Sequence, residues 1–282
     1  MEKKKITIIG AGMMGSALAF PAAENGHEVH IVGTCLDDKI IDGYLATGKH
    51  EKFCRPFPEN VNYHYFKDWK TVVEGSDFVI GGVSSFGVDW FLEEILIQLD
   101  PEMPVLSVTK GLRATDDGSL LSYPGYWMSE LAKRGIHRDI CAVGGPCTSY
   151  ELVFKDPTEV AFCGWDNEVL RMMKQAMQRP YYHISLTNDV IGLESAVALK
   201  NAYAMAVTLA VGLNIRWHGE EEVQHFNSQA GTFTQAVRET HALMLLQGGE
   251  FESECIGLGD LYVTIFSGRT RRCGVLKIGR AS

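Results

Sequence analysis

The stretch from Ile6 to Gly15 reads Ile-Thr-Ile-Ile-Gly-Ala-Gly-Met-Met-Gly and decides the fold of the amino-terminal half. Its β-branched run predicts a strand, and the three glycines have the G-x-G-x-x-G spacing of a dinucleotide-binding turn. In such a turn Gly10 permits a tight reversal and Gly12 lets the backbone come close to a pyrophosphate, while Gly15 allows a helix to pack closely on the strand. We therefore predict that the chain opens on a dinucleotide-binding strand–turn–helix unit.

The rest of the first part alternates predicted strands with predicted helices. This alternation is typical of a Rossmann-type, doubly wound, mostly parallel sheet covered on both faces. Ligands bind such sheets beyond the carboxyl ends of the strands, so we expect segments 83–87 and 109–115 to lie near the glycine turn. The expected strands are Ile6–Ile9, Val29–Val32, Asn62–Phe66, Phe78–Val83, Val105–Thr109, Ile140–Val143, Val160–Cys163 and Tyr181–Leu186, and the expected helices are Ser16–Asn25, Val88–Gln98, Tyr126–Arg134 and Glu168–Gln178.

Strand patterns end near residue 188, and the remainder predicts helices alone. A long helix capped by Asn188 or Asp189 should run to about Gly212. A second is expected over Glu222–Leu246, and a short third within Ser253–Phe266. We therefore divide the chain into a dinucleotide-binding domain, residues 1–188, and an all-helical domain for substrate and catalysis, residues 189–282.

Composition narrows the functional classes. The 282 residues are 46% hydrophobic and 22% charged, which is typical of a soluble globular protein. The formal net charge of −9 argues against nucleic acid or an anionic membrane surface as a partner. Seven cysteines, none in a C-x-x-C pair, predict reduced thiols rather than disulfides or a zinc ribbon, and no metal site is expected. We expect a cytoplasmic protein.

The long apolar helix of the second part raises the question of a membrane span. Lys200 and Asn201 lie near the middle of segment 195–213, where a bilayer would disfavour them by several kcal/mol. Alanines recur along the segment and suit close helix packing. We expect a buried core helix and no membrane insertion.

Lys200 is the most informative residue of that helix. Val197, Ala204 and Val207 share its helix face, so its amine approaches an apolar environment. Because desolvation disfavours the charged form of a lysine, such an amine can serve as a general acid or base. The alternative is a lysine whose ammonium reaches the helix surface.

Three further motifs carry polar groups, and each has a functional and a purely structural interpretation. Lys110 ends a strand before Gly111 and either points into the crevice or is a solvated turn lysine. Segment 144–148, Gly-Gly-Pro-Cys-Thr, either offers backbone N–H groups to an anion or forms a tight turn. Arg269, Arg271 and Arg272 either bind phosphate through guanidinium forks or form a solvated cluster.

These motifs together resemble the soluble, nicotinamide-dependent glycerol-3-phosphate dehydrogenase family. They occur in family order at family-like intervals, from residue 5 to about 274. The matching segments are Gly10-Ala-Gly-Met-Met-Gly15, Ser107-Val-Thr-Lys-Gly-Leu112, Gly145-Pro146, Ala198-Leu-Lys-Asn-Ala-Tyr203, Gly257-Leu-Gly-Asp-Leu261 and Ser267-Gly-Arg269.

The resemblance implies an oxidoreductase that interconverts dihydroxyacetone phosphate and sn-glycerol 3-phosphate with NAD(P)(H). It also implies that the product supplies glycerophospholipid synthesis and that the protein is a homodimer. It implies that Lys200 exchanges a proton with the substrate C2 oxygen, within a polar network of Lys110, Asp260, Asn201 and Thr264. The substrate phosphate is expected at Arg269 and Thr270. The expected cofactor contacts are Gly10, Gly12, Met13, Met14, Gly15, Thr34 and Phe86.

Three departures from the family pattern stand out. Thr270 replaces the usual asparagine after the arginine, and Cys147-Thr148 replaces the usual small residues after Gly145-Pro146. The sequence ends at Ser282, so the helical domain is expected to be shortened at its carboxyl end. Two alternatives therefore stand beside the dehydrogenase. They are a reductase of another small oxo or hydroxy acid, and a catalytically silent dinucleotide-binding protein.

Cofactor choice depends on the end of the second strand. NAD-selective folds place an acid there for the ribose hydroxyls, whereas here Gly33 and Thr34 follow the strand and the first acid is Asp37. Thr34 can donate a hydrogen bond to the extra phosphate of NADP, and Lys39 lies nearby in sequence. We therefore expect NADPH to be accepted at least as well as NADH.

Overall fold

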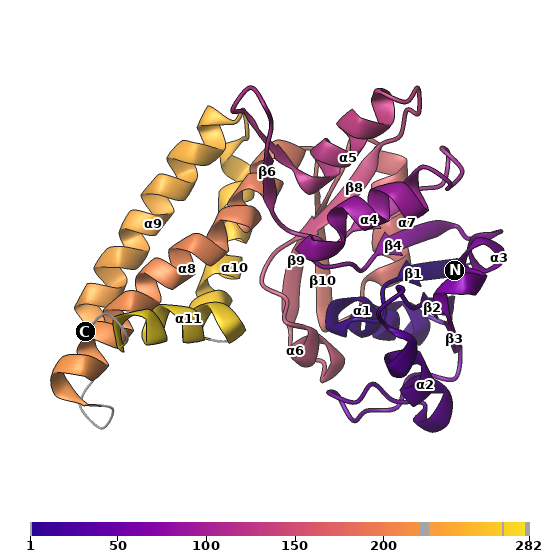
Figure 1. Cartoon of the computed structure of the whole chain (residues 1–282), viewed down its shortest axis with the longest axis horizontal. Coiled ribbons are helices and arrows are strands. Elements are labelled where there is room, and N and C mark those ends of the chain that lie inside the picture. The colour runs from indigo at the N-terminus through magenta and orange to yellow at the C-terminus, as the bar shows by residue number, and fades with distance from the viewer. Residues whose placement is uncertain (1, 220–225, 267, 280–282) are drawn as a thin grey trace. The chain divides into compact units, whose positions relative to one another are not determined.

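The computed structural model describes residues 2–219, 226–266 and 268–279, with side chains up to residue 276 (Figure 1). The chain divides into two compact units. Unit 1 comprises Met1–Val143 and Cys147–Asn188, and unit 2 comprises Gly144–Pro146 and Asp189–Ser282. Residues 222–225, the start of one expected helix, lie outside the described residues.

Unit 1 is built on an eight-stranded sheet of order β10-β9-β8-β5-β4-β1-β2-β3. β1 pairs in parallel with both β2 and β4, so the strand order reverses beside β1, as it does at the ligand-binding edge of a Rossmann-type sheet. The predicted fold class is confirmed. The strands are β1 Lys5–Ile9, β2 Glu28–Val32, β3 Val61–His64, β4 Phe78–Gly81, β5 Val105–Ser107, β8 Ile140–Gly144, β9 Thr158–Cys163 and β10 Tyr182–Thr187.

Helices cover both faces of this sheet. Successive strand residues point to opposite sides, and apolar residues on both sides need a covering layer. Ile6 and Ile8 belong to one apolar core and Ile9 to the other. The first core contains residues of α1, α6 and α7, and the second those of α3, α4 and α5. The helices of unit 1 are α1 Met13–Glu24, α2 Asp38–Thr47, α3 Trp69–Val73, α4 Val88–Phe91, α5 Tyr123–Ala132, α6 Ser149–Val153 and α7 Asn167–Met177, with short turns η1 Phe66–Asp68, η2 Ser85–Gly87 and the π-helical η3 Leu92–Leu96.

Several local expectations for unit 1 were wrong. The first helix begins at Met13 rather than Ser16, because Gly12 is its N-cap and the last part of the glycine motif forms its first turn. Segment 109–115 contains a strand, β6 Leu112–Ala114, which forms an antiparallel hairpin with β7 Leu120–Ser122. The expected helix over Val88–Gln98 is present as α4 and η3, but its second half is π-helical and it ends at Leu96. The short helices α2 and α6 were not predicted, because neither carries a long apolar repeat.

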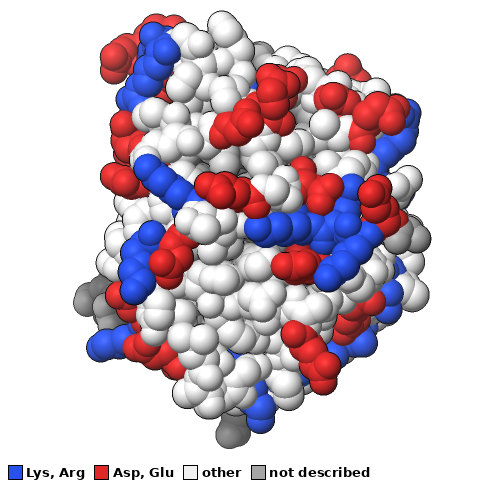
Figure 2. Space-filling view, turned by 90° about the vertical axis from the view of Figure 1, so that its right-hand side faces the viewer, with Lys and Arg blue, Asp and Glu red and all other residues white. Residues whose placement is uncertain are grey.

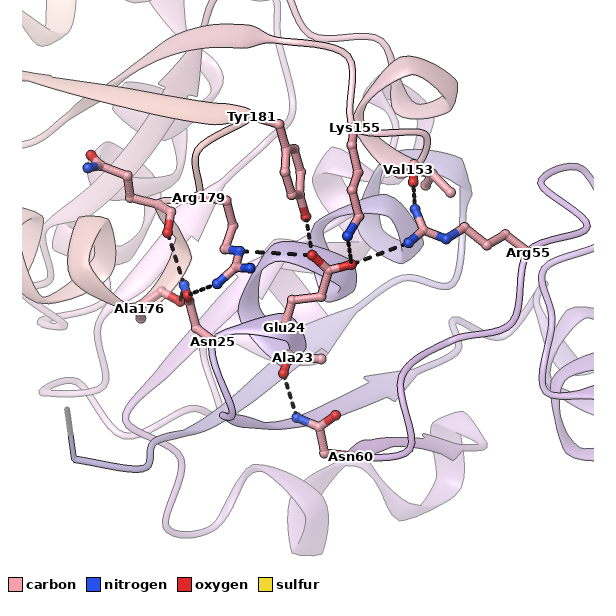
Figure 3. A network of polar contacts seen from close by, with 11 residues as sticks. Ala23, Glu24, Asn25, Arg55, Asn60, Val153, Lys155, Ala176, Arg179 and Tyr181 are labelled. Carbon is pink, nitrogen blue, oxygen red and sulfur yellow. Dashed lines mark hydrogen bonds and ion pairs between the residues drawn. The ribbon is translucent and has the colours of Figure 1, made fainter.

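A cluster of charged side chains ties four segments of unit 1 together (Figure 3). The Glu24 carboxylate, at the end of α1, lies 3.4 Å from Arg55, 3.1 Å from Lys155 and 3.9 Å from Arg179. It also accepts a 2.9 Å hydrogen bond from the Tyr181 hydroxyl. We call Glu24 and these four partners the Glu24 cluster. One carboxylate thus joins α1 to three loops that are distant in sequence.

On the face seen in Figure 2, basic side chains are bordered by acidic ones rather than forming a surface of one sign. This mixed pattern agrees with a chain that carries 26 Lys and Arg residues against 35 Asp and Glu residues. Isolated ion pairs between exposed side chains contribute little to the free energy of unfolding.

Unit 2 is a helical assembly around α8, Val190–His218, which packs against α9 Phe226–Leu246, α10 Glu254–Phe266 and α11 Gly268–Gly279. α8 continues beyond the expected end at Gly212, and α11 was not predicted. A Cβ at Gly257 would lie 2.5 Å from the Ala196 Cβ, and one at Gly212 would lie 2.8 Å from the Val275 carbonyl oxygen. Small residues therefore let these helices approach closely.

Among the described residues, α8 alone is long and apolar enough to cross a membrane by length and composition. Its inner positions carry buried polar groups, namely Glu194, Thr208 and Asn214, and its small residues face α10 and α11. These contacts are those of the core helix of unit 2.

Candidate active site

The glycine turn of unit 1 is packed against a fourth glycine. Gly10 has a φ of +113°, which favours glycine, and a Cβ there would lie 2.7 Å from the Gly82 carbonyl oxygen. A Cβ at Gly15 would overlap the Gly10 carbonyl oxygen. Gly82 follows β4, and its N–H donates to the Ile9 carbonyl oxygen over 2.8 Å. The exits of β1 and β4 therefore form one tightly packed piece of backbone.

Gly12 differs from its two partners in the motif. A Cβ there would have no atom within 4 Å, so it would stand in open space at the start of α1. The first turn of α1 has no acidic residue, and no side chain caps its N–H groups. Free N–H groups at a helix start favour an anion. The residues present thus fit a pyrophosphate, with Met13 exposed and Met14 partly buried beside it.

The exit of β2 is fastened to the glycine turn by Asp37. Its Oδ2 accepts hydrogen bonds from the Thr34 N–H and the Thr34 hydroxyl, both at 2.8 Å, and from the Ala11 N–H at 3.2 Å. The Thr34 hydroxyl thus donates to Asp37. Sequence reasoning named Asp37 only as the first acid after the strand. The signal for its role was the spacing Thr34-x-x-Asp37, which is typical of a side-chain-closed turn.

The exits of β4 and β5 lie together, as expected from the parallel sheet. The Thr109 hydroxyl donates to the Val83 carbonyl oxygen over 2.8 Å, and Lys110 follows at once, partly buried. Phe86, in η2, is 96% exposed. These segments and the glycine turn occupy the same edge of the sheet, at the carboxyl ends of the strands.

In unit 2 the structure brings Lys200 and Asp260 together. The Lys200 Nζ donates a hydrogen bond to the Asp260 Oδ1, and the two side chains are 14% and 1% exposed. Val197, Ala204 and Val207 on the same face of α8 are buried, as the helical spacing predicted. Lys200 is therefore a largely buried, ion-paired lysine rather than one that reaches the surface.

The other predicted substrate contacts of unit 2 lie on helices adjacent to this pair. Asn201 is exposed, and its Oδ1 accepts a 3.1 Å hydrogen bond from the Thr270 hydroxyl, which joins α8 to α11. Thr264 stands one turn after Asp260, and its hydroxyl donates to the Asp260 carbonyl oxygen over 2.6 Å. Arg269, next to Thr270, is exposed. Thr270, a departure from the family pattern, thus has a defined polar partner.

Segment 144–146 packs with these helices. A Cβ at Gly144 would lie 2.9 Å from Leu193 and Val197 of α8, and one at Gly259 would lie 3.0 Å from Pro146. The two glycines and the proline therefore bring the segment close to both α8 and α10. The predicted site residues form two groups. The predicted cofactor contacts and Lys110 belong to unit 1, and the other predicted residues belong to unit 2.

Family models match nearly the whole chain. A model of the NAD-dependent glycerol-3-phosphate dehydrogenase N-terminus matches residues 5–170, and one of the NAD-dependent glycerol-3-phosphate dehydrogenase C-terminus matches residues 189–281. The boundary between the two matches lies close to the start of α8.

Individual relatives agree with these matches. An NADP(+)-dependent glycerol-3-phosphate dehydrogenase of Archaeoglobus fulgidus is 30% identical over 273 residues, which are 96% of this chain and 79% of the relative. A glycerol-3-phosphate dehydrogenase [NAD(P)+] of Clostridium botulinum is 24% identical over 276 residues, 96% of this chain and 78% of that protein. The crystal structure of glycerol-3-phosphate dehydrogenase from Coxiella burnetii shares the fold, with a TM-score of 0.84 and 23% identity, covering 99% of this chain and 82% of the other.

Proposed function

Because the chain belongs to the NAD-dependent glycerol-3-phosphate dehydrogenase family, we propose that it interconverts dihydroxyacetone phosphate and sn-glycerol 3-phosphate with NAD(P)(H). A bound nicotinamide ring supplies or takes the hydride at the substrate C2 carbon. The observation that carries the proposal beyond family membership is the Lys200–Asp260 pair, since it places a proton-bearing amine on an apolar helix.

Lys200 is proposed as the general acid and base. In the reductive direction its ammonium donates a proton to the C2 oxygen as that oxygen gains charge, and in the oxidative direction the amine takes the proton back. Asp260 accepts a hydrogen bond from the Lys200 Nζ and so fixes the direction of the amine. The buried position of Asp260 supports this orienting role, because a buried carboxylate needs a partner of opposite charge.

The remaining residues of unit 2 are proposed to bind the substrate. The exposed Arg269 guanidinium suits phosphate oxygens, and the Thr270 hydroxyl together with the Asn201 amide offers polar groups beside it. Thr264, one helical turn from Asp260, is proposed to contact the substrate hydroxyls. In unit 1, Lys110 is proposed as a further substrate contact, and Gly10, Gly12, Gly15, Met13, Met14, Thr34 and Phe86 as the cofactor-binding residues.

We propose further that the protein works in the cytoplasm as a homodimer, with its product entering glycerophospholipid synthesis. Seven free cysteines fit a reducing compartment. Large apolar side chains on unit 2 are exposed, among them Leu246, Tyr262 and Phe266, and a second copy would cover such a surface. Light scattering coupled to size-exclusion chromatography tests the dimer, and a monomer at micromolar concentration would contradict it.

The deciding experiment measures NADPH and NADH oxidation by the purified protein with dihydroxyacetone phosphate and, in parallel, with unphosphorylated dihydroxyacetone. We expect turnover with the phosphorylated substrate at least about a hundredfold more efficient, because a charge-assisted phosphate contact contributes roughly 1.5–3 kcal/mol per hydrogen bond. Equal efficiency with both would favour a reductase of another small oxo or hydroxy acid. Tight cofactor binding without turnover would favour a catalytically silent dinucleotide-binding protein.

A further inference from the structure

A hollow lies at the exits of β2 and β3, on the edge of the sheet that also carries the glycine turn. It has a volume of about 450 Å³ and is lined by Cys35, Asp38, Tyr65, Phe66 and Lys67. We call it the β2–β3 pocket. Its residues come from two segments that are far apart in sequence, the turn before α2 with the first residue of that helix, and residues 65–67 after β3. Neither the phosphate-binding role of the glycine turn nor the chemistry of unit 2 accounts for it.

The parallel pairing of β2 and β3 creates the pocket. Val32 is the register partner of His64, and the Gly33 N–H donates to the His64 carbonyl oxygen over 3.0 Å. The residues that follow these strands therefore leave the sheet at the same edge. Because β2 lies next to β1, this edge also carries the glycine turn.

Asp37 links the segment that carries the pocket to the pyrophosphate position. Asp37, immediately before the pocket residue Asp38, accepts a hydrogen bond from the Ala11 N–H within the glycine turn. A dinucleotide whose pyrophosphate lies at the start of α1 directs its adenosine ribose towards the end of the second strand. The β2–β3 pocket is the hollow that the structure provides at that end.

The lining chemistry suits a phosphorylated nucleoside. Tyr65 and Phe66 offer aromatic surface, which stacks on purine rings. The Lys67 Nζ lies 5.6 Å from the centre of the Tyr65 ring and is exposed. A lysine ammonium there is free to approach a phosphate on the ribose, because ring contact leaves its three N–H donors available.

We propose that the β2–β3 pocket receives the adenosine 2′-phosphate of NADP and that Lys67 is the residue that pairs with it. The inference rests on the proposed function, which requires a nicotinamide dinucleotide. It replaces the sequence expectation for Thr34 and Lys39, since the Thr34 hydroxyl donates to Asp37 and the pocket lining includes Lys67 rather than Lys39.

Asp38 disfavours a phosphate in this pocket and so provides a second variant for the test. Its carboxylate also lines the pocket and repels a phosphate dianion. Lys67 offsets that repulsion when the 2′-phosphate is present, whereas the same Asp38 tolerates an unphosphorylated ribose. The pocket therefore discriminates between the two dinucleotides through a pair of opposite charges.

The test measures binding without turnover. Isothermal titration calorimetry of the full chain with 2′,5′-ADP and with 5′-ADP isolates the contribution of the 2′-phosphate. We expect Lys67→Gln to weaken 2′,5′-ADP binding about tenfold or more, because a charge-assisted hydrogen bond is lost, and to change 5′-ADP binding less than twofold. Lys67→Arg should retain most of the affinity, and Asp38→Asn should raise the affinity for 2′,5′-ADP alone.

Lys70→Gln is the matched control, since Lys70 is an exposed lysine whose Nζ lies over the Trp69 ring, outside the pocket. The proposal is overturned if Lys67→Gln lowers both affinities equally, if it lowers neither, or if Lys70→Gln has the same effect. It is also overturned if the unchanged protein binds 2′,5′-ADP no better than 5′-ADP. A protein that shows the expected binding pattern but does not reduce dihydroxyacetone phosphate would instead contradict the proposed function.

Discussion

Glu24 and Asp260 are two largely enclosed carboxylates that face cations, and they differ in what surrounds them. The Glu24 carboxylate, 14% exposed, receives Arg55, Lys155 and Arg179 from three separate loops (Figure 3). The Asp260 carboxylate, 1% exposed, pairs with Lys200 across two packed helices. Several cations converging on one anion fasten distant segments together. A largely buried amine hydrogen-bonded to a buried carboxylate on an apolar helix is instead suited to proton exchange.

The position of each carboxylate supports this contrast. The Glu24 cluster joins segments that enter β9 and β10, whereas ligands bind such a sheet at the carboxyl ends of its strands. Asp260 is followed one turn later by Thr264, and its partner Lys200 is followed by Asn201, which reaches Thr270. We infer that the Glu24 cluster contributes to folding stability and that the Lys200–Asp260 pair contributes to chemistry.

The largest expected effect follows from removing the Lys200 amine. Lys200→Met should lower kcat by roughly 10²–10⁴-fold, because general acid–base assistance is lost, while NADPH binding by unit 1 stays within twofold. Lys200→Arg keeps the positive charge beside Asp260 but cannot give up its proton, so it should restore thermal stability without restoring kcat. Steady-state kinetics, NADPH titration and thermal melts supply the three readouts. If the Lys200→Met protein kept more than a tenth of the normal kcat, Lys200 would have a structural role, like the one inferred for Glu24.

A smaller effect is expected at Arg269. Arg269→Ala should lower kcat/KM for dihydroxyacetone phosphate by about 10–100-fold, because a charge-assisted contact with phosphate is lost. Activity on unphosphorylated dihydroxyacetone should change little. Arg272→Ala, at an exposed arginine of the same helix, is the control. Equal losses on both substrates would mean that Arg269 supports the helix rather than the phosphate.

The Glu24 cluster should show the opposite signature. Glu24→Gln leaves three cations without their shared carboxylate, so we expect a loss of about 1–2 kcal/mol in the free energy of unfolding, with kcat unchanged. Glu168→Gln is the matched control, because Glu168 pairs with Arg171 on the surface, where the two side chains are 84% and 55% exposed. Urea denaturation of both variants measures the difference. A stability of Glu24→Gln equal to that of Glu168→Gln would show that the cluster contributes no more than a surface pair.

The smallest expected effect concerns two histidines that contact each other. His30 and His64, on neighbouring strands, share a 2.9 Å hydrogen bond between ring nitrogens, and His30 also contacts Glu28. Burial lowers the pKa of both histidines below the ordinary value, and nearby Lys5 acts in the same direction, while Glu28 raises the pKa of His30 and Asp68 that of His64.

Because the folded chain binds these protons more weakly than the unfolded chain, stability should fall as the pH drops below about 6.5. Urea midpoints between pH 7.5 and pH 5.5 measure this dependence, and His64→Gln should flatten it. An unchanged slope in His64→Gln would assign the pH dependence to other histidines. His27 and His50 also have a lowered pKa from burial.

The sequence was a good guide wherever a local pattern determines the structure. The β-branched run before Gly10 predicted β1, and the glycine spacing predicted a turn whose close approach to Gly82 the structure then shows. The helical spacing around Lys200 correctly placed it among buried residues. In each case the predictive pattern lies within one strand, turn or helix, although the approach to Gly82 itself is a contact between distant segments.

The remainder depends on contacts between distant segments. Nothing near Lys67 in the sequence indicates that its turn leaves the sheet beside Cys35, because that proximity comes from the pairing of β2 with β3. Only the family resemblance placed Asp260 near Lys200, because the contact between them comes from the packing of α10 on α8. The hairpin β6–β7 and the helix α11 were missed because turn-rich and arginine-rich segments resemble loops in a local reading.

The packing of Gly82 against Gly10 and Gly15 has a consequence for how the protein is made. The first strand, turn and helix contain the whole glycine motif, yet its backbone geometry is completed by a residue that follows β4. During synthesis, a nascent chain that ends before Gly82 therefore lacks part of the cradle, whatever local structure it has formed. We therefore expect nucleotide affinity to appear only after β4 has joined β1, so that dinucleotide binding would report the assembly of the centre of the sheet.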